Sequence, residues 1–314
     1  MSSETSFRLC SRAPRMMSWS ATAVLEVGRC SVVRSRWCGE SCPSRGKWSN
    51  RCSHSLPVVT TAPRGARTVS RTSDTPGCQD GRVTDLDALR RLPGAESALA
   101  DVLAALPDAA WSEPSALPGW TRGHVVAHLV LNAEGMAAAV TAVREGRPAT
   151  LYASQEARDG DIEGTATADP TVLRDRLRTA TTVLAAALAS LPDQPPEVDT
   201  AFVPRVPGSD RGFVIGELPW MREREVRIHL VDLDVGHGHR AWPATFSEQL
   251  VTSLAVRVDA TLSASDADRT WHDAQDTATV VTGSLADLAW WLTGRGAGGG
   301  LSADGGPLPH VAPW

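Results

Sequence analysis

Apolar positions recur every three or four residues in several segments of this 314-residue chain, which is the period of an α-helix with a buried face. The first predicted helix covers 95–106, just after Pro93-Gly94. The second begins behind Thr121, whose hydroxyl can cap a helix N-terminus, and ends near residue 145. This second helix is apolar over most of its length and is therefore predicted to lie in a core.

Two more helical segments follow a polar stretch that contains Gly160 and Gly164. Asp169-Pro170 supplies a capping residue and a first-turn proline for a third helix, which ends near residue 191. The fourth helix is predicted over 218–235 and is closed by glycines. Long helices joined by loops predict a four-helix bundle over residues 83–238.

The pattern changes after residue 238. Residues 246–260 are predicted to be helical, 277–282 to form a strand, and Ser284 to cap a short helix over 285–292. A glycine cluster and a proline-rich end follow. We therefore expect a small α+β C-terminal domain over 239–314, which makes the fold class of the whole chain α+β.

The first 82 residues have a different composition from the rest. They contain 13 basic and 5 acidic residues, against 18 and 31 in residues 83–314, and they hold all six cysteines. No sustained period of 2 or 3.6 runs through them, and the cysteine spacings do not match paired zinc knuckles. We interpret residues 1–82 as a disordered or non-native extension and expect a natural start near Val83.

Composition also limits the function. A net charge of −5 gives no reason to expect nucleic-acid binding. The longest uninterrupted apolar runs are much shorter than a membrane helix requires, so we expect no membrane span and a cytoplasmic protein. The sequence leaves the oligomeric state open.

Three side chains on two of the predicted helices could meet. Glu225 and His229 lie four residues apart and share a helical face, and His128 can face them if the second and fourth helices are neighbours. Two imidazoles and a carboxylate with a fourth position open are the ligand set of catalytic zinc. Asp232 could accept a hydrogen bond from the other ring nitrogen of His229.

The same residues have simpler explanations. A histidine on an apolar helical face is often a core residue, and a Glu–His pair four apart is often a surface ion pair. His124 lies on the face of His128 and is an alternative ligand. No HExxH motif is present, which disfavours a zinc protease.

Several motifs resemble the mycothiol-dependent maleylpyruvate isomerase family, one of the DinB-like metal-dependent helical bundles. They are the stretch 117–129 (LPGWTRGHVVAHL), the following Asn132-Ala133-Glu134, the Glu225-x3-His229-x2-Asp232 element, and the stretch 283–295 (GSLADLAWWLTGR). The resemblance covers about 85–314. It implies His128, Glu225 and His229 as zinc ligands and favours His128 over His124, because the Ala-His-Leu position is the one that matches.

The resemblance also implies a reaction. Zinc and mycothiol would be the cofactors of a cis–trans isomerase that converts maleylpyruvate to fumarylpyruvate in gentisate breakdown. Residues 83–314 contain no cysteine, so a thiol has to arrive with a small molecule. Arginine suits carboxylate recognition, which makes Arg222 and Arg224 candidates for substrate binding and Arg295 a candidate catalytic cation. The alternatives are a mycothiol S-transferase acting on another electrophile and a non-enzymatic metal-binding bundle.

Overall fold

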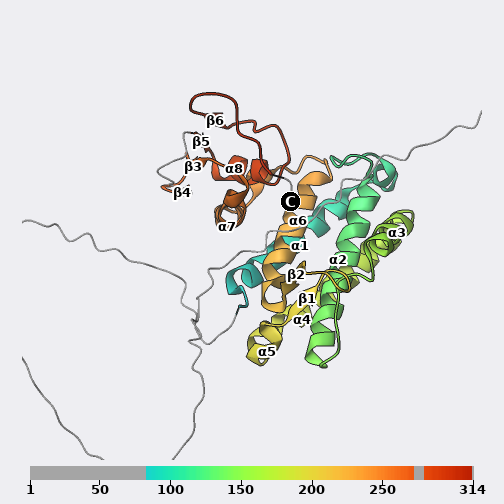
Figure 1. Ribbon diagram of the computed structural model, residues 1–314. Coiled ribbons are helices and arrows are strands. Elements are labelled where there is room, and N and C mark those ends of the chain that lie inside the picture. The colour runs from blue at the N-terminus through green and yellow to red at the C-terminus, as the bar shows by residue number, and fades with distance from the viewer. Residues whose placement is uncertain (1–82, 272–278, 313–314) are drawn as a thin grey trace, which may run out of the picture. The chain divides into compact units, whose positions relative to one another are not determined.

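The computed structural model of the protein describes residues 83–271 and 279–312, which belong to one compact unit. The interpretation of residues 1–82 as an extension lies outside these residues. The described chain is rich in helix and ends in a small mixed sheet (Figure 1), so the predicted α+β class is confirmed.

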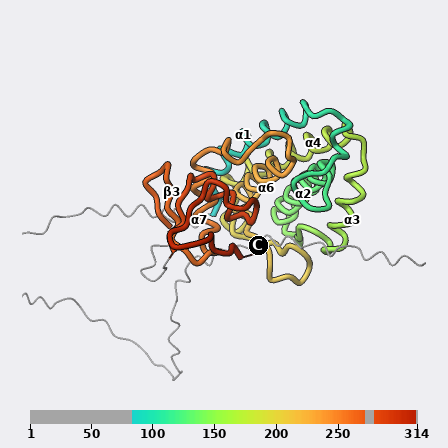
Figure 2. Tube along the Cα trace, turned by 90° about the horizontal axis from the view of Figure 1, so that it is seen from above, coloured from blue at the N-terminus to red at the C-terminus, as the bar shows by residue number. Residues whose placement is uncertain are grey.

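Four long helices form the bundle, and a shorter one lies beside it. Helix α1 packs against α4 and α6, and α2 packs against α3, α4 and α6 (Figures 1 and 2). A short antiparallel hairpin of β1 and β2 precedes α6. The bounds are α1 Leu86–Ala105, α2 Arg122–Arg144, α3 Gln155–Ala166, α4 Pro170–Ala189, α5 Pro196–Asp199, β1 Phe202–Pro204, β2 Gly212–Val214 and α6 Leu218–Asp232.

Helix α2 is the core helix of the bundle. Thr121 caps it by accepting a hydrogen bond from the backbone N–H of His124, as its sequence predicts. By length and composition α2 could cross a membrane, but 72% of its most apolar window is buried inside the protein. Its apolar surface is therefore used in packing against other helices.

The start of the first predicted helix is wrong, and one helix of the bundle region was not predicted. Helix α1 begins at Leu86 and runs through Pro93, because Asp85 caps it and Leu92 and Leu99 are buried on the face that contacts the bundle. The stretch 155–166, predicted only as polar, is helix α3. Ser154 caps this helix by accepting from the backbone N–H of Ala157, and capping offsets the low helix propensity of its two glycines.

The C-terminal elements are two helices and a four-stranded sheet, and their core also includes Ala88 of α1 and Trp220 and Ile228 of α6. The strand order is β4-β3-β5-β6; β3 and β5 are parallel and the other pairs antiparallel. The short helix after Ser284 has the predicted bounds. The bounds are α7 Ala244–Leu254, β3 Thr261–Ala264, β4 Thr270–Trp271, β5 Val280–Gly283, α8 Leu285–Leu292 and β6 Ser302–Ala303. The proposed domain boundary at residue 239 stays a prediction.

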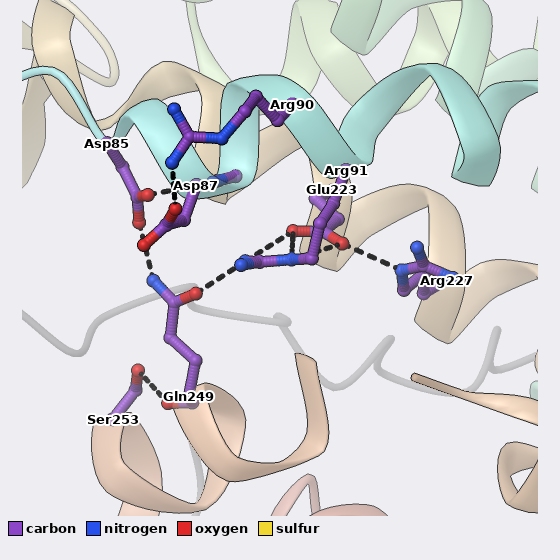
Figure 3. A network of polar contacts seen from close by, with 9 residues as sticks. Asp85, Asp87, Arg90, Arg91, Glu223, Arg227, Gln249 and Ser253 are labelled. Atoms are coloured by element: carbon purple, nitrogen blue, oxygen red, sulfur yellow. Dashed lines mark hydrogen bonds and ion pairs between the residues drawn. The ribbon is translucent and has the colours of Figure 1, made fainter. Parts of the chain in front are cut away.

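A buried ionic network connects α1, α6 and α7 (Figure 3). Glu223 on α6 has no exposed surface and accepts two hydrogen bonds from Arg91 Nε, one from Arg91 Nη2 and one from Arg227 Nε, at 2.8–3.1 Å. Gln249 on α7 accepts from Arg91 and donates to Asp85. These contacts fix the first C-terminal helix against the bundle.

Candidate metal centre

His128, Glu225 and His229 meet between α2 and α6. Oε2 of Glu225 lies 2.9 Å from Nε2 of His128 and 3.4 Å from Nε2 of His229. The two imidazole rings are nearly perpendicular, with centroids 4.7 Å apart. One possible ligand atom from each residue lies within 4.8 Å of the other two. In the described part of the chain, this is the one group of three or more His, Cys, Asp or Glu residues that could hold a metal ion.

Two arginines connect α2 and α6 by hydrogen bonds on either side of the cluster. Arg122, at the start of α2, donates from Nε to the carbonyl of Leu233 at 2.9 Å, beyond the end of α6. Arg222, one turn before Glu225, donates from Nη1 to the carbonyl of Leu129 at 2.9 Å. The three residues lie between these two hydrogen bonds along both helices. The distances between their ligand atoms are therefore set by the packing of α2 against α6.

The donor set fits a divalent ion. Zinc bound tetrahedrally by imidazole nitrogen and carboxylate oxygen at roughly 2.0–2.2 Å places its ligand atoms about 3.3–3.6 Å apart. The distances of 2.9 and 3.4 Å from Glu225 Oε2 to the two imidazole nitrogens differ from that range by a few tenths of an ångström at most. Two nitrogens and one oxygen leave a fourth position for a further ligand, which is the pattern of catalytic zinc sites.

The ionisation states also suit metal binding. Burial lowers the pKa of His128 to about 4, and nearby His229 and Arg158 act in the same direction, so the ring is neutral at physiological pH. The pKa of Glu225 lies well below its usual value, because hydrogen bonds from the two histidines outweigh burial. A neutral imidazole and an ionised carboxylate are the forms that coordinate metal.

His229 is connected to the C-terminal part of the protein through Asp232. Nδ1 of His229 lies 2.9 Å from Oδ2 of Asp232, and the Arg295 guanidinium donates to both oxygens of that carboxylate at 2.8–3.1 Å. Burial alone would lower the pKa of His229, but Asp232 and Glu225 outweigh it and raise the value. The positioning role of Asp232 and the catalytic role of Arg295 stay predictions.

His124, the alternative ligand, lies elsewhere. Its Nδ1 contacts the backbone N–H and the hydroxyl of Thr121, at 3.2 and 2.7 Å, and its Nε2 lies 3.2 Å from Glu163. The ring therefore helps to cap α2 and is not in the three-residue cluster.

The two arginines of α6 that the sequence suggested for substrate binding are buried. Arg222 has no exposed surface and contacts Glu96 and Asn132 in addition to the Leu129 carbonyl. Its contacts are those of a residue that joins α1, α2 and α6, and they do not favour substrate binding. Arg224 is 7% exposed. Its pKa is lowered, because the effect of burial outweighs that of Glu225 and Glu217, which raise it. Substrate binding by either residue stays a prediction.

Arg158 is a neighbour of the site that was not predicted from the sequence. This arginine lies on α3, and its Nη2 is 3.4 Å from Nδ1 of His128. Arg158 and Ile162 are the two buried residues of an otherwise polar helix. Their spacing of four residues on one helical face is the signal that could have identified them, had the helix itself been predicted.

Comparison with known proteins supports the resemblance noted in the sequence. The crystal structures of the mycothiol-dependent maleylpyruvate isomerase and of a histidine-to-alanine mutant of it are each similar to this chain, at 26% identity and a TM-score of 0.63. Each match covers 73% of this chain and 96% of the other. No curated protein matches the chain. The family model of the mycothiol maleylpyruvate isomerase N-terminal domain matches residues 92–234, the part of the chain that holds all three residues of the cluster.

Proposed function

We propose that the protein is a zinc-dependent isomerase that converts maleylpyruvate to fumarylpyruvate with mycothiol as its thiol coenzyme. The observation that carries this proposal is the cluster of His128, Glu225 and His229, whose three ligand atoms lie within 4.8 Å of one another inside the matched domain. The similarity of the whole described fold to a mycothiol-dependent maleylpyruvate isomerase supports it.

The ion and the thiol have separate tasks. A zinc ion held by the three side chains would lower the pKa of a thiol that reaches its fourth position and keep the sulfur as thiolate near neutral pH. The thiol has to come from outside, because the last cysteine in the sequence is Cys78 and the matched domain begins at residue 92. Such chemistry requires a reducing compartment, which agrees with the cytoplasmic location predicted above.

The proposed reaction conserves the thiol. A carbon–sulfur bond forms at the double bond of maleylpyruvate, and the π electrons move onto the conjugated carbonyl to give an enolate. Rotation about the new single bond changes cis to trans. The enolate electrons then re-form the double bond, the carbon–sulfur bond breaks, and the thiolate leaves.

The protein's own residues hold and orient the site during these steps. His128 and Glu225 keep fixed positions because α2 and α6 are tied on both sides of them. Asp232, 2.9 Å from Nδ1 of His229, would orient this ring so that Nε2 is directed at Glu225. Arg295 brings a positive charge from the C-terminal part to this side of the site, where it can stabilise substrate carboxylates and the enolate.

The two alternatives predict different behaviour of the thiol. An S-transferase would use the same site but leave sulfur attached to its electrophile, so it would consume one thiol per turnover. A non-enzymatic metal-binding bundle would bind zinc tightly and show no thiol-dependent turnover.

The test is an ultraviolet assay of maleylpyruvate with purified protein, with and without mycothiol and chelator, combined with metal analysis. We expect turnover that needs both thiol and metal and leaves the thiol concentration unchanged. His128→Ala, Glu225→Ala and His229→Ala should each remove most bound zinc and most activity, whereas His124→Ala should keep zinc. Full zinc occupancy in all three variants would refute the proposal.

A further inference from the structure

Arg158 is a buried cation beside the candidate metal centre. It is 9% exposed, and its Nη2 lies 3.4 Å from Nδ1 of His128, the ring nitrogen on the side away from Glu225. Its Nη1 donates to Asp159 at 2.7 Å. Its Nε is buried and has no hydrogen-bond partner among the described residues.

Three other buried arginines of the described chain each form an ion pair with a largely buried carboxylate. Arg222 pairs with Glu96, Arg227 with Glu223, and Arg295 with Asp232, and the side chains of these three acids are 0–12% exposed. The side chain of Asp159, in contrast, is 37% exposed and occupies only Nη1 of Arg158. Burying a guanidinium without a matching carboxylate is costly, so this arginine is suited to an anion that arrives from outside.

Metal binding would remove a further partner of Arg158. When Nε2 of an imidazole coordinates an ion, the ring's hydrogen is carried by Nδ1. Nδ1 of His128 would then be a donor, and it could no longer accept from Nη2 of Arg158, which is also a donor. In the loaded site the guanidinium would therefore have donors at both Nε and Nη2 that need an acceptor.

The surroundings add positive charge at this side of the site. The guanidinium carbon atoms of Arg158 and Arg205 each lie 5.6 Å from the ring centre of Tyr152. The indole of Trp120 lies near His128, with ring centroids 5.9 Å apart. An acceptor bound here would thus be anionic and would lie within reach of an aromatic side chain.

We propose that Arg158 binds a carboxylate of the substrate and positions the substrate's chain beside His128. The inference rests on the proposed function for the identity of that substrate, a molecule with a carboxylate at each end. Arg158 comes from α3 and lies on the Nδ1 side of His128, so it would hold one charged end of the substrate there. Planar guanidinium groups suit this task because they bind carboxylates through two parallel hydrogen bonds.

The test measures binding of maleate, a small cis-dicarboxylate, to the zinc-loaded protein by calorimetry with no thiol present. Arg158→Gln should weaken maleate binding about 10- to 100-fold, the range for loss of a charge-assisted hydrogen-bond pair. Arg178→Gln, at a side chain that is 77% exposed on α4, is the matched control and should bind as the wild type does. Uncharged dimethyl maleate should not distinguish the variants. Wild-type affinity of Arg158→Gln for maleate would overturn the proposal.

Turnover supplies the second measurement. Arg158→Gln should raise KM for maleylpyruvate and leave both KM for the thiol and the zinc content unchanged; a higher KM for the thiol alone would overturn the proposal. If Arg158→Gln does not fold, Arg158→Lys takes its place. This variant should bind maleate at least about 5-fold more weakly than the wild type, because lysine cannot form two parallel hydrogen bonds with a carboxylate. Maleate binding needs neither thiol nor turnover, so Arg158-dependent binding without isomerisation would refute the proposed function and leave this inference standing.

Discussion

Replacing Asp232 by asparagine tests how the C-terminal part supports the metal centre. The change keeps the shape of the side chain and removes its charge. Asp232 is 1% exposed and contacts both His229, at 2.9 Å, and Arg295, at 2.8 Å. Loss of a carboxylate that orients a metal-binding histidine lowers metal affinity about 10- to 100-fold, which is roughly 1.4–2.7 kcal/mol.

Two effects of this substitution on zinc affinity have opposite signs. Asp232 raises the pKa of His229, so its removal lowers that pKa and reduces competition from protons near neutral pH. Its removal also frees the ring to rotate and makes it a weaker ligand. At pH 8 proton competition is small, and we expect the loss of orientation and basicity to dominate there.

The assay is competition for zinc against a chelating indicator at pH 8, with urea unfolding of the metal-free protein as a second measurement. Removing one partner of a buried ion pair costs about 3 kcal/mol or more, so Asp232→Asn should also lower the free energy of unfolding. Asp175→Asn, in an exposed pair with Arg178, is the control and should change neither quantity. Zinc affinity of Asp232→Asn within twofold of the wild type would refute this account of the site.

Three further predictions concern zinc affinity and the free energy of unfolding. Zinc affinity should fall as pH drops from 7 to 6, because the pKa of His229 is raised and zinc must displace a proton from this ring. His128, whose pKa is about 4, carries no proton to displace, and an affinity independent of pH would contradict this. Glu223→Gln should lower the free energy of unfolding by about 3 kcal/mol in urea titrations, since it leaves two arginines without their buried carboxylate, and a loss below about 1 kcal/mol would show the network to be unimportant. Gly216→Ala should cost about 1–3 kcal/mol in the same measurement, because its Cβ would lie 2.6 Å from Oδ1 of Asp199 and 2.8 Å from the backbone nitrogen of Thr84. An unchanged midpoint would contradict this close packing.

The sequence predicts the parts of the site that depend on local signals. Thr121 marks the start of α2, and the spacing of Glu225 and His229 places both on one face of α6. That α2 and α6 are neighbours depends on long-range packing, which no local pattern specifies; the prediction relied on the bundle architecture and on the family resemblance.

The sequence does not predict what depends on context. Residues 155–166 have weak helix propensity, so their helix depends on the Ser154 cap and on packing of Ile162 against the bundle. Arg158 was missed together with that helix. Arg222 has the sequence signature of a charged residue on an amphipathic helix, yet it is fully buried because Glu96 and Asn132 from two other helices meet it there.

The separation of the candidate ligands along the chain has a consequence for the unfolded protein. His128 and Glu225 are 97 positions apart, so an ion held by both would act as a reversible cross-link that closes a loop of about that length. By the chain-entropy relation for cross-links, closing a loop of about 100 residues is worth about 4.7 kcal/mol, comparable to a long-range disulfide. Residues 83–314 contain no cysteine, and a bound ion would give this part of the chain a long-range tether that sulfur chemistry within it cannot provide.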